Sequence, residues 1–139
     1  MTRKILYFIN PFSGANRKTA LKEMLIEKTL EQNIFFEILF TNDEGDYPFL
    51  INKIKKEAFT DVVICGGDGT VNQIASYLTG TDINIGIIPT GSGNGLALAA
   101  KIPKNINKAI NTKITVRIKS LMSSLNCSSI SSATFDVVN

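Results

Sequence analysis

A glycine-rich turn, CGGDGTVNQI at residues 65–74, directly follows the apolar run at residues 61–64. A short run rich in β-branched residues and bounded by glycines is typical of a buried strand. After the turn, apolar side chains recur at helical spacing through residue 78, and Gly80 is a typical helix end signal. The turn is therefore predicted to join the end of a strand to the start of a helix.

Strand and helix patterns alternate along most of the chain. Apolar runs predict strands over residues 4–10, 34–40, 61–65 and 83–88, and helical spacing predicts helices over residues 18–32, 47–58 and 71–78. This alternation predicts an α/β fold of three layers, a parallel sheet with helices on both faces. Ligands of such sheets bind outside the carboxyl ends of the strands. The polar glycine loops after the first, third and fourth strands are therefore expected to share one crevice.

Composition narrows the class of protein. With 139 residues, of which 44% are hydrophobic, the chain can bury the core of one domain. The sequence has no histidine, which excludes histidine-based triads and the common zinc clusters. Its two cysteines, Cys65 and Cys127, form no disulfide framework, and no stretch approaches the length of a membrane span. We expect a soluble cytoplasmic protein, at most peripheral to a membrane.

Charge and serine are distributed unevenly in the C-terminal part. No Asp or Glu occurs over residues 83–135, whereas six Lys and Arg lie there. The simplest interpretation is a solvated surface; contact with an anionic membrane is the alternative, and nucleic acid is not expected because no aromatic residues are interleaved with the basic ones. Seven of the ten serines lie over residues 120–132. We therefore divide the chain into a domain at 1–110 and an atypical serine-rich tail at 111–139, either disordered or the start of a second domain.

The glycines of the turn at residues 66–70 suit a phosphate group. Gly66, Gly67 and Gly69 let backbone amides approach an anion, Thr70 adds a hydroxyl, and the following helix directs its positive end to the same place. Asp68 is the exception, since a carboxylate repels phosphate. It indicates either a magnesium ion or a hydroxyl to be deprotonated, both needs of phosphoryl transfer, or else a simple helix cap.

The other two loops contain similar side chains. PTGSGNG at residues 89–95 alternates polar residues with glycines, and the first loop adds Asn10 and Ser13. A P-loop motif is absent, and the dinucleotide fingerprint fails because Leu96 occupies its last position. A dehydrogenase is therefore not expected.

Three motifs in this order, NPFSG at 10–14, GGDGTVN at 66–72 and PTGSGNGLA at 89–97, resemble the catalytic domain of the diacylglycerol kinase and sphingosine kinase family of lipid kinases. The resemblance covers about residues 3–110. It implies an N-terminal domain similar to those of NAD kinase and phosphofructokinase, and MgATP-dependent phosphorylation of a lipid hydroxyl. By this resemblance Asp68 would be the acidic residue at the reaction centre, either the base toward the lipid hydroxyl or a magnesium partner. The nucleotide-binding residues implied are Asn10, Pro11, Ser13, Gly14, Thr41, Gly66, Gly67, Asp68, Gly69, Thr70, Asn72, Thr90, Gly91, Ser92, Gly93 and Asn94.

The sequence departs from the family pattern in three ways. Gln73 replaces a common Glu, and Gly95 replaces the Asp of the common bacterial form. Members of the family are about twice as long, with a second, β-rich domain that holds the lipid. The chain is therefore expected to be the nucleotide-binding half of such a kinase. The alternatives are a non-catalytic nucleotide-binding module and a relative of the NAD kinases; the sequence does not identify the lipid or the oligomeric state.

Overall fold

The computed structural model describes residues 2–12, 18–91, 94–99 and 102. Strands and helices alternate in the order β1 (Lys4–Ile9), α1 (Lys18–Glu31), β2 (Phe35–Phe40), α2 (Leu50–Glu57), β3 (Asp61–Gly66), α3 (Asp68–Leu78), β4 (Asn84–Pro89) and α4 (Gly95–Ala99). All four strands are parallel, in the order β2-β1-β3-β4. The expected α/β architecture is confirmed, while the expected boundary at residue 110 lies outside the described residues.

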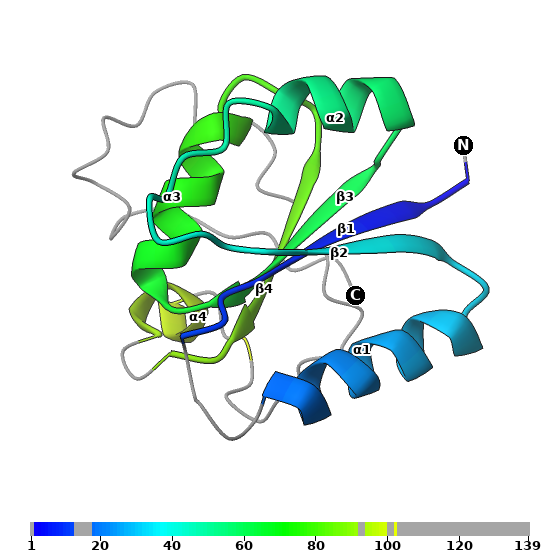
Figure 1. The fold of residues 1–139 in the computed structure, drawn as a ribbon, viewed down its shortest axis with the longest axis horizontal. Coiled ribbons are helices and arrows are strands. Elements are labelled where there is room, and N and C mark those ends of the chain that lie inside the picture. The colour runs from blue at the N-terminus through cyan, green and yellow to red at the C-terminus, as the bar shows by residue number, and fades with distance from the viewer. Residues whose placement is uncertain (1, 13–17, 92–93, 100–101, 103–139) are drawn as a thin grey trace.

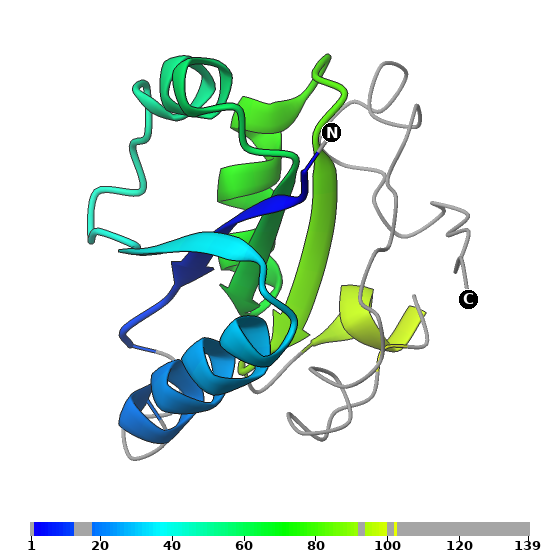
Figure 2. The ribbon, with the colours of Figure 1, turned by 90° about the vertical axis from the view of Figure 1, so that its right-hand side faces the viewer.

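Helices cover both faces of the sheet. In Figure 1, α1 lies below the sheet, whereas α2 at the top and α3 at the left lie on its other side; Figure 2 shows the same layers after a quarter turn. Alternate side chains of β1 and β3 enter two separate apolar clusters because successive strand residues point to opposite faces. Leu6, Phe8 and Ile64 belong to the cluster under α2 and α3, and Tyr7 and Cys65 to the one against α1. The result is a three-layer domain with β1 and β3 at its centre.

The starts of two helices differ from the sequence prediction. The helix expected from residue 47 begins at Leu50, because the buried ring of Tyr47 packs edge-on against Phe8, with their centroids 5.4 Å apart, before the helix starts. The helix expected from residue 71 begins three residues earlier, at Asp68, with Gly67 as its N-cap residue. The short helix α4 was not predicted. In each case tertiary contacts, which leave no periodic signal, set the boundary.

None of the helices in the described ranges is both long and apolar enough to cross a bilayer.

The central strand β3 provides a test of the packing. Ile64 is fully buried in the cluster under α2 and α3. We expect Ile64→Ala to lower the free energy of unfolding by about 2–5 kcal/mol, because it leaves a cavity that rigid neighbours cannot fill. Urea denaturation followed by circular dichroism measures this change. Leu98→Ala, at an exposed position, is the control, and an equal loss in both variants would contradict the burial described.

Candidate functional site

The carboxyl edge of the sheet gathers the predicted loops. The chain runs from β1 to β2 on one side and from β3 to β4 on the other, so the strand order reverses between β1 and β3. Crevices at such switch points are the usual ligand sites of open α/β sheets. Because all strands are parallel, the loops after β1, β3 and β4 leave the same edge, as the sequence predicts.

The first loop is joined to α3 through Asn10. Its side-chain amide donates a 2.8 Å hydrogen bond to the hydroxyl of Thr70, and its backbone N–H donates to the carbonyl of Cys65 at 2.9 Å. Its side-chain oxygen accepts the backbone N–H of Phe12, which shapes the turn that includes Pro11. The loop after β1 is therefore fixed against the glycine turn. Ser13 and Gly14 lie outside the described residues.

The loops after β3 and β4 touch through their backbones. Thr90 N–H donates to the carbonyl of Gly66 at 3.1 Å. A Cβ added to Gly91 would lie 2.6 Å from the Cα of Gly67, closer than real atoms come. Glycine is thus required at residue 91 by the contact between the two loops.

The glycines of the turn after β3 have different reasons to be glycine. A Cβ on Gly66 would lie 2.7 Å from the Cβ of Thr70, so a side chain there has no room. Around Gly69, in contrast, nothing lies within 4 Å of an added Cβ, and the residue is exposed. Packing therefore explains Gly66, whereas the bare face at Gly69 leaves the first turn of α3 open to an approaching ligand.

Asp68 links α3 to α4. It is the first residue of α3 and half-buried, and its Oδ2 accepts the backbone N–H of Gly95, the first residue of α4, at 2.8 Å. Gly67, not Asp68, is the N-cap residue of α3, and no side chain caps that helix. The expectation that Asp68 is a simple cap of its own helix is therefore wrong. Its carboxylate bridges two loops at the carboxyl edge.

Asn94 has an unusual environment. It is only 8% exposed and has a positive φ of 50°. Its side-chain amide donates to the carbonyl of Gly91, whereas its Oδ1 is the one buried side-chain polar atom in the described part of the chain that has no hydrogen-bond partner. Buried acceptors are nearly always paired, so this oxygen marks a place for a donor.

The remaining predicted residues are only partly connected to this site. Thr41 is buried at the end of β2, where its N–H donates to the carbonyl of Ile9 at 3.0 Å. Asn72 is half-buried on α3, one turn beyond the glycine turn. Ser92 and Gly93 lie outside the described residues. The structure thus brings together Asn10, Gly66, Gly67, Asp68, Thr70, Thr90, Gly91 and Asn94.

The expected magnesium ion would have Asp68 as its acidic partner. No group of three or more Asp, Glu, His or Cys side chains in the described ranges could hold a metal ion by itself. Mg²⁺ in kinase sites is usually held by one or two carboxylates together with substrate phosphates, and it keeps several waters. The residues therefore fit an ion that arrives with a nucleotide rather than one held by the protein alone.

A tyrosine cluster beside the loops has no signal in the sequence. Tyr77 on α3 donates a 2.6 Å hydrogen bond to the carboxylate of Asp46, and this bond raises the pKa of the Tyr77 phenol. The Tyr77 ring packs on Tyr47, with centroids 5.9 Å apart. Nearby, a Cβ on Gly45 would collide with the amide of Gln73, the residue that replaces the common Glu of the family. The segment after β2 is therefore held against α3.

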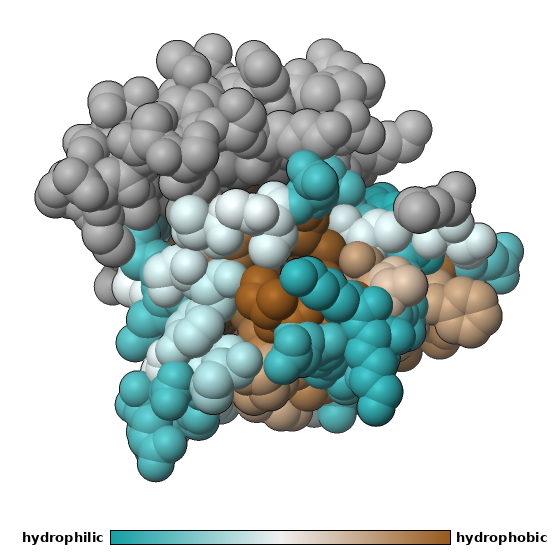
Figure 3. Space-filling view, turned by 90° about the horizontal axis from the view of Figure 1, so that it is seen from above, coloured by the Kyte–Doolittle hydropathy of each residue, from teal (hydrophilic) through white to brown (hydrophobic). Residues whose placement is uncertain are grey.

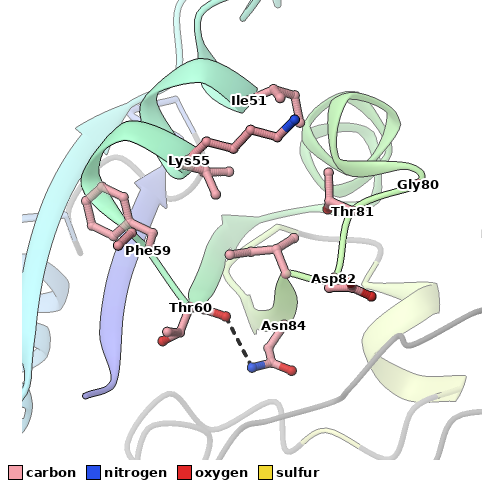
Figure 4. Close-up of a pocket in the computed structure, with 11 residues that line it drawn as sticks. Ile51, Lys55, Phe59, Thr60, Gly80, Thr81, Asp82 and Asn84 are labelled. Carbon is pink, nitrogen blue, oxygen red and sulfur yellow. Dashed lines mark hydrogen bonds between the residues drawn. The ribbon is translucent and has the colours of Figure 1, made fainter. Parts of the chain in front are cut away.

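A hollow of about 570 Å³ lies at the opposite edge of the sheet. Figure 3, seen from above, shows apolar surface exposed between hydrophilic side chains. In the close-up of Figure 4, the hollow lies between α2 and the segment after α3, and the carbonyl of Thr60 accepts a 3.1 Å hydrogen bond from the side chain of Asn84. None of the nucleotide-binding residues predicted from the sequence lines this hollow. The glycine loops and this hollow are therefore separate features.

Known proteins resemble this chain over most of its length. The family described as "Diacylglycerol kinase catalytic domain" matches residues 4–123. A "Putative lipid kinase" of Streptococcus pneumoniae is 33% identical over 111 residues, which are 78% of this chain and 38% of that protein. A "Probable lipid kinase YegS-like" of Enterobacter is 32% identical over 106 residues, 71% of this chain and 36% of the relative.

Solved structures agree with the sequence matches. A diacylglycerol kinase of Bacillus anthracis matches with a TM-score of 0.67 and 25% identity, over 79% of this chain and 41% of that structure. The chain spans well under half the length of these relatives.

The contact between the two glycine loops can be tested by a matched pair of substitutions. We expect Gly91→Ala to lower the free energy of unfolding by about 1–3 kcal/mol, because the added methyl forces the loops apart. Gly69→Ala has open space inside a helix and should be neutral or stabilising by up to about 1 kcal/mol. Thermal and urea unfolding measure both changes. The packing described is contradicted by equal stabilities of the two variants.

The thiol of Cys65 provides a second test. It is fully buried beneath the loops, and burial raises the pKa of this thiol well above its usual range. Both effects suppress the reactive thiolate. In a Cys127→Ser background, we expect no reaction with a chromogenic disulfide reagent at pH 8 until the protein is unfolded. Rapid reaction of the folded protein would place Cys65 at an accessible position instead.

Proposed function

Because the chain belongs to the diacylglycerol kinase catalytic-domain family of lipid kinases, we propose that it is the ATP-binding half of an enzyme that phosphorylates a lipid hydroxyl. The relatives extend well beyond the matched region. We assign the lipid pocket to the second, β-rich domain that the family resemblance implies. Nucleotide binding is accordingly the activity that we assign to these residues themselves.

The observation that carries the proposal is the convergence of three loops at one sheet edge. Three hydrogen bonds join them: Asn10 to Thr70, Thr90 to Gly66, and Gly95 to Asp68. A triphosphate needs donors from several directions, and amides of joined loops are preorganised to provide them. The same loops in a purely structural role would not need to keep an exposed glycine at residue 69.

The start of α3 supports the binding of phosphate. This helix has 11 residues, and no side chain caps its N-terminus. Its first backbone N–H groups and the positive end of its dipole are therefore suited to an anion. We assign the phosphates of ATP to Gly67, Gly69 and Thr70, with Asn10 holding the Thr70 hydroxyl in place.

The loop after β4 would contact the other side of the nucleotide. The buried Oδ1 of Asn94 lacks a donor, and a nucleotide amino or hydroxyl group, or a water that it orders, would supply one. Further residues are assigned to nucleotide binding on sequence alone: Ser92 and Gly93 in this loop, and Ser13, Gly14, Thr41 and Asn72 elsewhere in the chain. They remain part of the proposal.

Asp68 is the acidic group that we assign to the chemistry. A magnesium ion carried with ATP would neutralise phosphate charge, and Asp68 would either bind that ion or accept the proton of the lipid hydroxyl. The N–H of Gly95 stabilises the charged carboxylate and fixes its orientation. A side chain at residue 95 would crowd it, because an added Cβ lies 3.2 Å from Asp68 Oδ2.

We place the enzyme in the cytoplasm, where ATP is available, with peripheral contact to an anionic membrane. The acid-free stretch at residues 83–135 carries six basic residues. Each basic residue near such a surface contributes about 1 kcal/mol of attraction. Lipid substrate and basic surface would then lie on the same membrane.

A non-catalytic nucleotide-binding module is the second candidate. One contact favours it: the carboxylate of Asp68 already serves a structural bond to Gly95. In this candidate Asp68 holds two loops together and transfers no proton.

Binding of nucleotide is the first test. We expect MgATP to bind the 139-residue protein with a dissociation constant below about 1 mM, measured by isothermal titration calorimetry. Asp68→Asn keeps an oxygen acceptor for Gly95 but removes the charge, so we expect ATP to bind with a weaker dependence on magnesium. Asp82→Asn, an exposed acid at the opposite edge, is the control and should behave as the wild type.

Two outcomes would decide between the candidates. The absence of binding at millimolar MgATP would contradict both. Transfer of ³²P to diacylglycerol or a sphingoid base by the wild type would favour the kinase over the module, and transfer that survives Asp68→Asn would refute the catalytic assignment of Asp68.

A further inference from the structure

Strand β2 forms an open edge of the sheet. It pairs only with β1 in the described part of the chain, and Figures 1 and 2 show no strand beyond it. Its sequence is FFEILF, and the terminal rings Phe35 and Phe40 are 71% and 52% exposed. Exposed apolar edge strands are templates for pairing with another strand.

The register fixes which backbone groups face outward. The N–H of Thr41 donates to the carbonyl of Ile9, so residue 41 points its backbone groups toward β1. Backbone groups alternate sides along a strand. Phe36, Ile38 and Phe40 therefore direct their N–H and C=O groups to the open edge.

The usual protection of an edge is absent from β2. It contains no lysine, proline or glycine, and its single charge, Glu37, forms a 2.9 Å ion pair with Lys53 of the same chain. Monomeric proteins commonly block such edges with inward charges, prolines or bulges. Glu37 shares the amine of Lys53 with Glu57, so its carboxylate is held toward α2 of its own chain.

We propose that β2 pairs with β2 of a second copy of this chain, antiparallel, about a two-fold axis through Ile38. In this register Ile38 faces its own mate, and Phe36 faces Phe40 of the second copy at both ends. All three pairs use the outward groups, and each exchanges two backbone hydrogen bonds. The two sheets then join into one continuous sheet.

Side chains in this register are complementary. Phe36 and Ile38 pack against the cluster on the α1 face, and the amine of Lys22 lies 6.0 Å from the Phe40 ring centroid on the same face. The aromatic pairs of Phe36 and Phe40 therefore form on one surface, with the two Ile38 side chains between them. On the other face Glu37 lies opposite Leu39 of the second copy, so no like charges are directly opposed.

A second copy is favoured over an unrelated strand because the outward residues of β2 are complementary to the same residues of another β2: Ile38 pairs with Ile38, and Phe36 with Phe40. One six-residue strand is a small interface, so we expect a reversible dimer with a dissociation constant on the order of micromolar. This assembly is independent of the nucleotide site, which lies at the carboxyl ends of the strands rather than along the edge.

Sedimentation velocity over a range of concentrations tests the dimer. We expect the wild-type mass to approach that of two chains, and Phe40→Lys to weaken association by roughly tenfold or more, because lysine is the residue that most commonly protects edges. Leu98→Lys, an exposed apolar position on α4, is the matched control and should dimerise as the wild type does. Circular dichroism verifies that both variants are folded. A monomer at all concentrations, or a dimer insensitive to Phe40→Lys, would overturn the proposal.

Disulfide trapping tests the register. In a Cys127→Ser background, Ile38→Cys would place two thiols on the axis, with Cα atoms about 5.5 Å apart, within the range of a disulfide. Mild oxidation should give a covalent dimer. Glu37→Cys is the control, because its mate lies diagonally across the axis at about 8 Å, too far to bridge. Equal cross-linking of both variants, or none in Ile38→Cys, would refute the register.

Discussion

At the carboxyl edge two turns come into backbone contact where Gly91 lies against Gly67. This approach is possible because neither residue has a side chain, and it lets Thr90 reach the carbonyl of Gly66 and Asp68 reach the amide of Gly95. The contact between these two loops depends on it. A methyl group at residue 91 would push the turn that carries both the amides and Asp68 away from the turn that provides Asn94 and the N–H of Gly95.

The contact also explains why an acid can stand in a site for an anion. Asp68 begins α3, where the helix dipole favours negative charge, and it accepts an N–H from the start of α4. These interactions stabilise its carboxylate before any ligand arrives. Glycine at residue 95 allows this arrangement, because a Cβ added there would lie 3.2 Å from the Asp68 oxygen. The replacement of the common bacterial Asp by Gly95 therefore leaves room for the Asp68 carboxylate.

Much of the fold could be predicted from the sequence, because the strands are short, mostly apolar runs that end at polar, proline or glycine residues, and parallel strands place their loops at one edge. The contacts that join the loops could not. The hydrogen bond from Asn10 to Thr70 and the bond from Gly95 to Asp68 depend on distances that no spacing encodes. Strand order was also inaccessible: FFEILF has the composition of a buried strand, and only the topology shows it to be an edge. Tyr47 begins the helix predicted from the sequence, yet in the structure its ring is buried in the core before α2 starts at Leu50.

The central claim is that nucleotide binds where the three loops meet. Amide hydrogen exchange of the 139-residue protein, compared with and without MgATP, tests it most directly. The account predicts slower exchange at residues 66–70 and 90–95, with little change around Phe59 and Asn84 at the opposite edge. Protection confined to that opposite hollow, or no change at the glycine loops under saturating nucleotide, would contradict it.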